Sequence, residues 1–75
     1  MSRSLPSVTG REVLKALVGV GFVHISTKGS HAKVEHPDGR VAVVPIHGGR
    51  DIPRGTLGSI LRQAGLTVAE FRALL

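Results

Sequence analysis

The chain has 75 residues, no cysteine, and ten Lys and Arg against five Asp and Glu. This length predicts one domain, residues 1–75, and the lack of cysteine excludes disulfides and thiolate metal sites and fits a reducing cytoplasm. The N-terminus is polar and the sequence has no long apolar run. We therefore expect no signal peptide and no membrane-spanning helix. The net charge of +5 favours a polyanionic partner, and two Phe without Trp or Tyr argue against a platform of stacked bases.

A first helix is predicted over residues 10–18. Thr9 and Glu12 form a T-x-x-E capping box, in which each residue satisfies a free backbone N–H of the other. Val8 and Val13 are spaced as the hydrophobic staple of such a helix start. One apolar stripe then follows at helical spacing, formed by Val13, Leu14, Leu17 and Val18.

Residues 22–27, 31–36 and 40–45 are predicted strands, joined by tight turns into an antiparallel meander. The Pro-Asp-Gly segment at 37–39 is the second turn, and its spacing allows a loop of either two or three residues. Pro45 ends the third strand.

For the first hairpin, we expect Lys28 and Gly29 to form a two-residue loop, so that Thr27 pairs with Ser30. Alternation along the strands then sorts the side chains onto two faces. His24, His31 and Lys33 fall on a polar face, and Val23, Ile25, Ala32 and Val34 fall on an apolar face.

A second helix is predicted from about Pro53 to Gly65, with Leu57, Ile60, Leu61 and Ala64 as its apolar stripe. Thr67 and Glu70 form another capping box, which begins a short terminal helix through Leu75. The predicted fold class is therefore α+β, in the order α-β-β-β-α with a short extra C-terminal helix. Both longer helices must bury their stripes on one face of the three-stranded sheet, which leaves His31 and Lys33 on the open face.

Several motifs resemble, in order and spacing, those of the HicA (YcfA-like) toxins of HicA–HicB toxin–antitoxin pairs. They are "KGSH" at 28–31, "HPDGR" at 36–40, "VPIHGG" at 44–49 and "ILRQAGLT" at 60–67. The resemblance implies a double-stranded-RNA-binding-like fold, cleavage of mRNA as an endoribonuclease (an mRNA interferase), and inhibition by a HicB-like antitoxin. It also implies that His31 is the catalytic histidine. Gly58 is a departure, because relatives often carry a basic residue there.

The chemistry of RNA makes histidine a suitable catalyst without a metal or cofactor. The 2′-hydroxyl is a built-in nucleophile, so the enzyme needs groups that accept and donate protons and cations that stabilise the phosphorane. Histidine suits the first role, since its reference pKa is about 6.5. We expect His31 to transfer a proton, Lys28 and Lys33 to bind the phosphate, and Gly29 and Ser30 to shape the loop beside them.

Alternatives remain for the other residues and for the function. His47 is a candidate second acid or base, or a hydrogen-bonding residue of its glycine-rich loop, and His36 is expected to stabilise its turn. The histidine spacings lack the close pairs typical of a metal site. A non-catalytic RNA-binding domain with the same fold is the alternative function. Exposed apolar residues such as Phe71 and Leu74 are candidates for contact with a protein partner.

Overall fold

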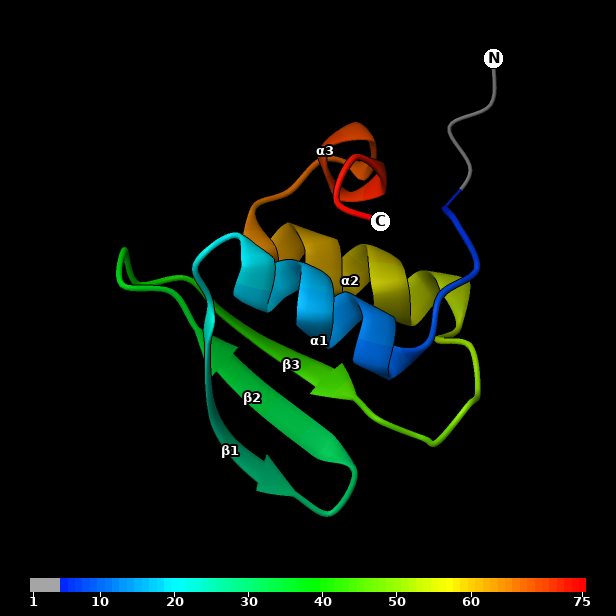
Figure 1. Ribbon diagram of the computed structural model, residues 1–75, viewed down its shortest axis with the longest axis horizontal. Coiled ribbons are helices and arrows are strands. Elements are labelled where there is room, and N and C mark those ends of the chain that lie inside the picture. Colours follow the sequence, from blue (N-terminus) through cyan, green and yellow to red (C-terminus); the bar gives the residue numbers. More distant parts are fainter. Residues whose placement is uncertain (1–4) are drawn as a thin grey trace.

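The computed structural model describes residues 5–75, and in this part of the chain three helices and three strands follow the predicted order α-β-β-β-α-α. The strands form an antiparallel sheet in the order β1-β2-β3. α1 and α2 lie side by side on one face of the sheet, and α3 lies on the far side of these two helices (Figure 1). No helix within residues 5–75 is long and apolar enough to cross a membrane. The element bounds are α1 Gly10–Gly19, β1 Val23–Lys28, β2 His31–Glu35, β3 Val41–Pro45, α2 Arg54–Ala64 and α3 Val68–Arg72.

Both predicted capping boxes form. Thr9 Oγ1 accepts the N–H of Glu12 at 3.2 Å, and Glu12 Oε1 accepts the N–H of Thr9 at 2.8 Å. Thr67 and Glu70 repeat this arrangement at the start of α3 with distances of 3.0 and 2.7 Å. The hydrogen bonds from Thr67 lower the pKa of the Glu70 carboxyl, because they stabilise its ionised form. Local sequence therefore fixes where α1 and α3 begin.

The hydrophobic core lies between the helices and one face of β2 and β3. Ala32 and Val34 on β2 alternate with exposed residues, as do Ala42 and Val44 on β3, so one face is buried and the other is open. The predicted stripe of α2 is fully buried. In α1 the stripe is shifted from the prediction, since Ala16 is buried and Val18 is 48% exposed. The core residues with the largest buried side chains are Leu17, Phe22, Leu57, Ile60 and Phe71.

The first hairpin has a different loop from the one predicted. Gly29 and Ser30 form the turn, and Lys28 pairs with His31. Gly29 has φ +59°, and Ser30 does not have a positive φ, which is the pattern of a type II′ turn with glycine at its first position. The expected Lys28-Gly29 loop would have placed the glycine at the second position of the turn. The observed turn lies one residue later in the chain than predicted.

A β-bulge in β1 also corrects the predicted faces. Ser26 pairs with Lys33, but His24 pairs with Val34, so the register shifts between them at Ile25. One extra residue reverses the alternation for everything before it. His24 therefore lies on the helix side of the sheet, and Val23 lies on the open face, both opposite to the prediction.

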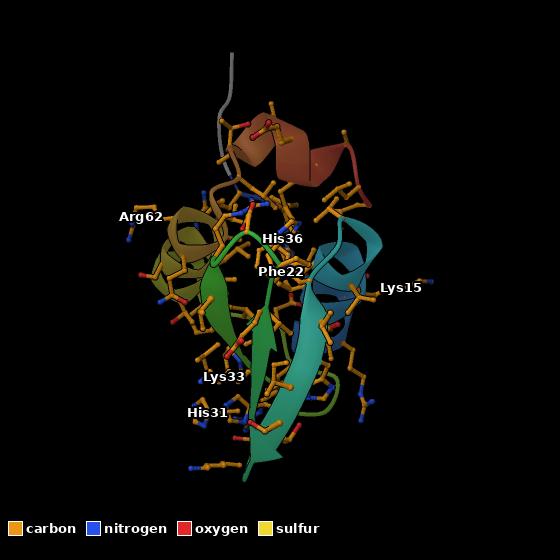
Figure 2. The ribbon with its side chains drawn as sticks, turned by 90° about the vertical axis from the view of Figure 1, so that its left-hand side faces the viewer. Lys15, Phe22, His31, Lys33, His36 and Arg62 are labelled. Carbon is orange, nitrogen blue, oxygen red and sulfur yellow. The ribbon has the colours of Figure 1, made fainter. Side chains whose placement is uncertain are left out.

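The bulge brings Phe22 into the core, where it is 2% exposed (Figure 2). Without it, Phe22 would stand on the polar face. Burying such a side chain contributes about 1.5–3 kcal/mol, more than the roughly 0.5–1.5 kcal/mol of one ladder hydrogen bond. β1 itself extends beyond the helices, and Val23 and Ile25 are 53% and 50% exposed. The expectation that both belong to a buried apolar face was wrong.

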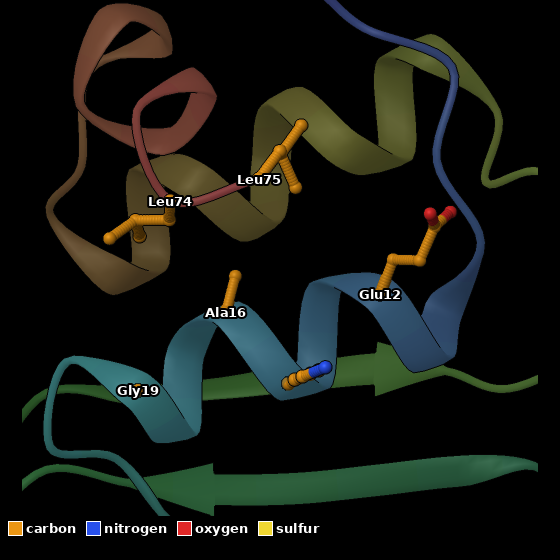
Figure 3. A pocket seen from close by; sticks show the side chains of 6 residues that line it. Glu12, Ala16, Gly19, Leu74 and Leu75 are labelled. Carbon is orange, nitrogen blue, oxygen red and sulfur yellow. The ribbon is translucent and has the colours of Figure 1, made fainter.

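The C-terminal residues pack over the helices. Phe71 is fully buried, so the suggestion that it is exposed for a partner was wrong, whereas Leu74 is 37% exposed. Leu74 and Leu75 face α1 across a groove of about 400 Å³, whose opposite side includes Glu12 and Ala16 (Figure 3). The groove contains no histidine and lies apart from the open face of the sheet.

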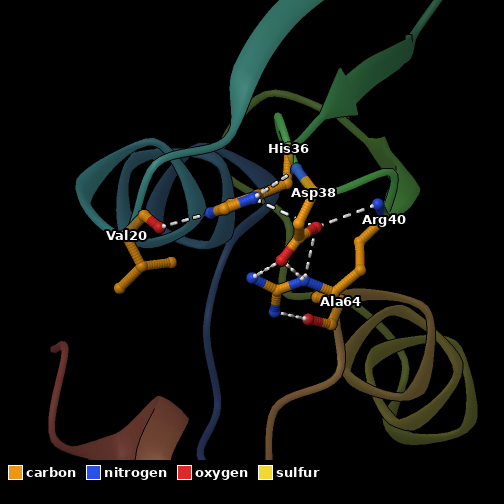
Figure 4. A network of polar contacts seen from close by, with 5 residues as sticks. All are labelled: Val20, His36, Asp38, Arg40 and Ala64. Atoms are coloured by element: carbon orange, nitrogen blue, oxygen red, sulfur yellow. Dashed lines mark hydrogen bonds and ion pairs between the residues drawn. The ribbon is translucent and has the colours of Figure 1, made fainter.

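The "HPDGR" segment joins the C-terminal ends of both long helices to the sheet (Figure 4). His36 Nε2–H donates to the carbonyl of Val20 at 3.2 Å, just after α1. Arg40 donates to the Asp38 carboxylate through Nε and to the carbonyl of Ala64, at the end of α2, through Nη1. The N–H of His36 donates to the carbonyl of Arg40 at 2.8 Å, so the loop between them has three residues. His36 is thus a structural residue of this turn, as the sequence indicated.

The half-buried Gly58 offers a test of helix stability. Its added Cβ would meet only the Arg62 side chain at 3.5 Å, an ordinary contact. We expect Gly58→Ala to stabilise the protein by about 0.5–1 kcal/mol, because alanine loses less backbone entropy in a helix. Gly65→Ala is the matched contrast, since φ is +71° there, and it should destabilise by roughly 1–2 kcal/mol. Urea unfolding measures both changes in the free energy of unfolding. Equal changes for the two variants would contradict this difference between the two glycines.

The turn network predicts an acid-dependent loss of stability. The Arg40 hydrogen bond lowers the pKa of Asp38 from its ordinary value of 3.8. The ionised Asp38 therefore contributes stability above about pH 4, and this contribution is lost as the pH falls through the lower folded pKa. We expect Asp38→Asn to be less stable than the wild type at pH 7, with a gap that narrows on acidification. Thermal unfolding measured over a range of pH checks this prediction, with Asp51→Asn as the charge-matched control. A stability difference between Asp38→Asn and the wild type that does not change with pH would contradict it.

Candidate active site

The open face of the sheet presents His31 and two lysines near the β1–β2 turn. His31 is the first residue of β2, and it pairs with Lys28 on β1 and with Pro45 on β3. Lys33 lies two residues further along β2, so it shares the face of His31 (Figure 2). The side chains of Lys28, His31 and Lys33 thus share one exposed surface at one end of the sheet.

His47 lies beside His31, although 16 positions separate them in sequence. Their ring centroids are 6.3 Å apart, and the ring planes are inclined by 84°. Both residues are exposed, and within residues 5–75 neither imidazole has a hydrogen-bond partner. Two exposed imidazoles therefore lie side by side at the open end of the sheet.

Backbone hydrogen bonds hold the loop that carries His47. The N–H of Ile46 donates to the carbonyl of Ser30, which ties the end of β3 to the β1–β2 turn. The N–H of Arg50 donates to the carbonyl of His47 at 3.1 Å, and Ile52 donates to Val8 at 2.8 Å. The loop thus depends on main-chain bonds, and the imidazole of His47 is left available.

Lys33 forms an ion pair with Glu35 on the same strand. Lys33 Nζ lies 3.5 Å from Glu35 Oε2, and both side chains are more than 40% exposed. Exposed pairs of this kind contribute between zero and about 1 kcal/mol, so the ammonium group can exchange Glu35 for a phosphate at small cost. Lys28 has no carboxylate partner among residues 5–75.

A groove of about 290 Å³ lies on the other side of the same turn, between α1 and the β1–β2 hairpin. Its lining includes Arg11 and Leu14 from α1 and His24 and Thr27 from β1. Sequence reasoning missed this feature, because His24 was assigned to the face of His31. The true face of His24 depends on the bulge at Ile25, and no sequence pattern predicted that bulge.

A comparison with protein-family models matched residues 10–66 to the HicA toxin of bacterial toxin–antitoxin systems. A comparison with curated proteins gave no match. The matched segment includes α1, the whole sheet, α2 and both His31 and His47. It covers most of the 75 residues, and membership implies an antitoxin partner. The chain therefore belongs to the HicA toxin family.

Proposed function

We propose that this toxin is a metal-independent endoribonuclease that cleaves mRNA in the cytoplasm by acid–base catalysis. The observation that supports the proposal is the short distance between His31 and His47, whose ring centroids lie 6.3 Å apart on an exposed surface. Cleavage of an RNA strand through its own 2′-hydroxyl needs two proton transfers at one phosphodiester. Two unpartnered imidazoles side by side supply both.

In the proposed reaction, a neutral imidazole accepts the proton of the 2′-hydroxyl as that oxygen attacks the adjacent phosphorus. The second imidazole, protonated, donates its proton to the departing 5′-oxygen. The bond from phosphorus to the 5′-oxygen breaks, leaving a 2′,3′-cyclic phosphate on one fragment and a 5′-hydroxyl on the other. His31 is one of these groups, as the family resemblance implies, and His47 is the other.

The lysines supply the charge that the reaction requires. The phosphorane carries more negative charge than the diester, so cations near its oxygens lower the barrier. Lys28 is paired with His31 across the turn, and Lys33 shares its face. Gly29 and Ser30 form the tight turn that places Lys28 beside the histidine.

A HicB-like antitoxin would inhibit this site by covering it. Val41 and Val43 are about 40% exposed on the open face. They are the cross-strand partners of Glu35 and Lys33. A partner that buries these valines would also close access to the histidines. The apolar and cationic character of this face suits an acidic protein with some apolar side chains.

Replacing His31 tests the catalytic assignment. We expect His31→Ala to lose at least about a hundredfold in cleavage rate, the usual contribution of general acid–base catalysis. The assay follows a long transcript in EDTA, and it also measures RNA retention by gel shift. Arg62→Gln is the control, because Arg62 lies on α2 away from His31 (Figure 2).

The outcomes separate the two candidate functions. Cleavage in EDTA that His31→Ala abolishes, with the thermal unfolding midpoint unchanged, supports the nuclease. RNA retention without any cleavage by the wild type supports instead the non-catalytic RNA-binding domain. An active His31→Ala protein would refute the role of His31.

The pH profile tests His47. If the two histidines act as base and acid, kcat/KM of the wild type should pass through a maximum with a limb on each side. We expect His47→Gln to flatten one of these limbs and to lower the maximum, while RNA affinity changes little. A variant that keeps both limbs would show that His47 transfers no proton.

A further inference from the structure

We propose that the groove between α1 and the β1–β2 hairpin binds the base of a nucleotide next to the scissile phosphate. The inference rests on the proposed nuclease function, and it names the substrate as an unpaired RNA strand. The groove has a volume of about 290 Å³. Its lining contains neither His31 nor His47, so it is separate from the surface that carries them.

The lining suits a base. Leu14, Ala32 and Ile46 give the groove an apolar lining that suits a flat ring, while Arg11 and Thr27 bring polar groups to it. Bases are bound in single-stranded RNA by stacking on His or Arg side chains and by hydrogen bonds to their edges. The chain lacks Trp and Tyr, so Arg11 and His24 are the stacking surfaces that this groove offers.

His24 is held in place in the groove. Its Nε2 lies 2.7 Å from Thr27 Oγ1, a hydrogen bond that fixes the imidazole plane. The bulge at Ile25 directs His24 to the helix side of the sheet, away from the face of His31. This histidine is therefore placed for binding rather than for the proton transfers assigned to His31 and His47.

The groove is continuous with the proposed catalytic site along two segments. Ser30 and Ile46 line it, and each is the residue immediately before one of the paired histidines. The groove and the two imidazoles therefore lie on opposite sides of the same end of the sheet, one residue apart along the backbone. An RNA strand that crosses this end of the sheet can place a phosphate at the histidines and the neighbouring base in the groove. A base in a duplex is stacked and paired, so only an unpaired strand fits.

The test uses a short oligoribonucleotide with one 2′-deoxy residue at its cleavage site, which removes the nucleophile and leaves the RNA intact. Binding is followed by NMR on the whole chain, with inorganic phosphate as a second probe. We expect the oligonucleotide to shift the ring signals of His31 and His47 and the amide signals of Leu14 and Thr27. Phosphate should shift the His31 and His47 signals alone.

A charge-matched pair of variants adds a kinetic readout. Arg11→Gln should raise KM for short single-stranded substrates about tenfold with kcat little changed, because it removes a stacking surface but no proton-transfer group. Arg62→Gln removes the same charge outside the groove, and it should leave KM within about twofold.

Each result decides the proposal. Shifts at the paired histidines with none at Leu14 or Thr27, or equal KM values for the two variants, would overturn the groove and leave the nuclease proposal intact. Shifts at Leu14 and Thr27 without any at His31 or His47 would support the groove and contradict the catalytic pair. No shift at either place would overturn both.

Discussion

The packing of α1 and α2 on one face of β2 and β3 is the constraint on which the rest of the structure depends. Val34 and Val44 are fully buried in the same core cluster as Leu17 of α1 and Leu57 of α2, and they come from strands whose alternate residues are exposed. A chain of 75 residues has too few apolar side chains to cover both faces of the sheet. The opposite face is therefore left open, and the residues displayed there are available to a substrate.

The need to bury Phe22 shapes the first strand. The aromatic side chain enters the core only because β1 gains an extra residue at Ile25, and the gain from burial exceeds the cost of a disturbed ladder. Arg40 then covers the ring at 5.2 Å, and His36 meets its edge at 5.1 Å. The same bulge turns His24 toward α1, so a packing requirement in the core also creates the lining of the groove.

The four histidines of the chain have separate environments. His36 is bonded within the turn that joins both helix ends to the sheet, and His24 is bonded to Thr27. His31 and His47 instead make a ring contact with each other on the exposed face. The rings of His36 and His24 are thus bonded to other residues of the fold, whereas those of His31 and His47 have no hydrogen-bond partner within residues 5–75.

Local sequence alone determined the helix starts, the three strands, the buried face of β2, and the shared exposed face of His31 and Lys33, whereas the facing of β3 was settled by the three-residue loop seen in the structure. These features depend on hydrogen bonds between residues three positions apart and on the two-residue period of a strand, so a short stretch of chain contains all the information. Only the tertiary structure decided the turn at Gly29 and Ser30, the bulge at Ile25, and the meeting of His31 with His47. The bulge and the histidine pair depend on residues far apart in the chain: the bulge on the space available to Phe22 in the core, and the pair on the loop that Ser30 and Val8 hold.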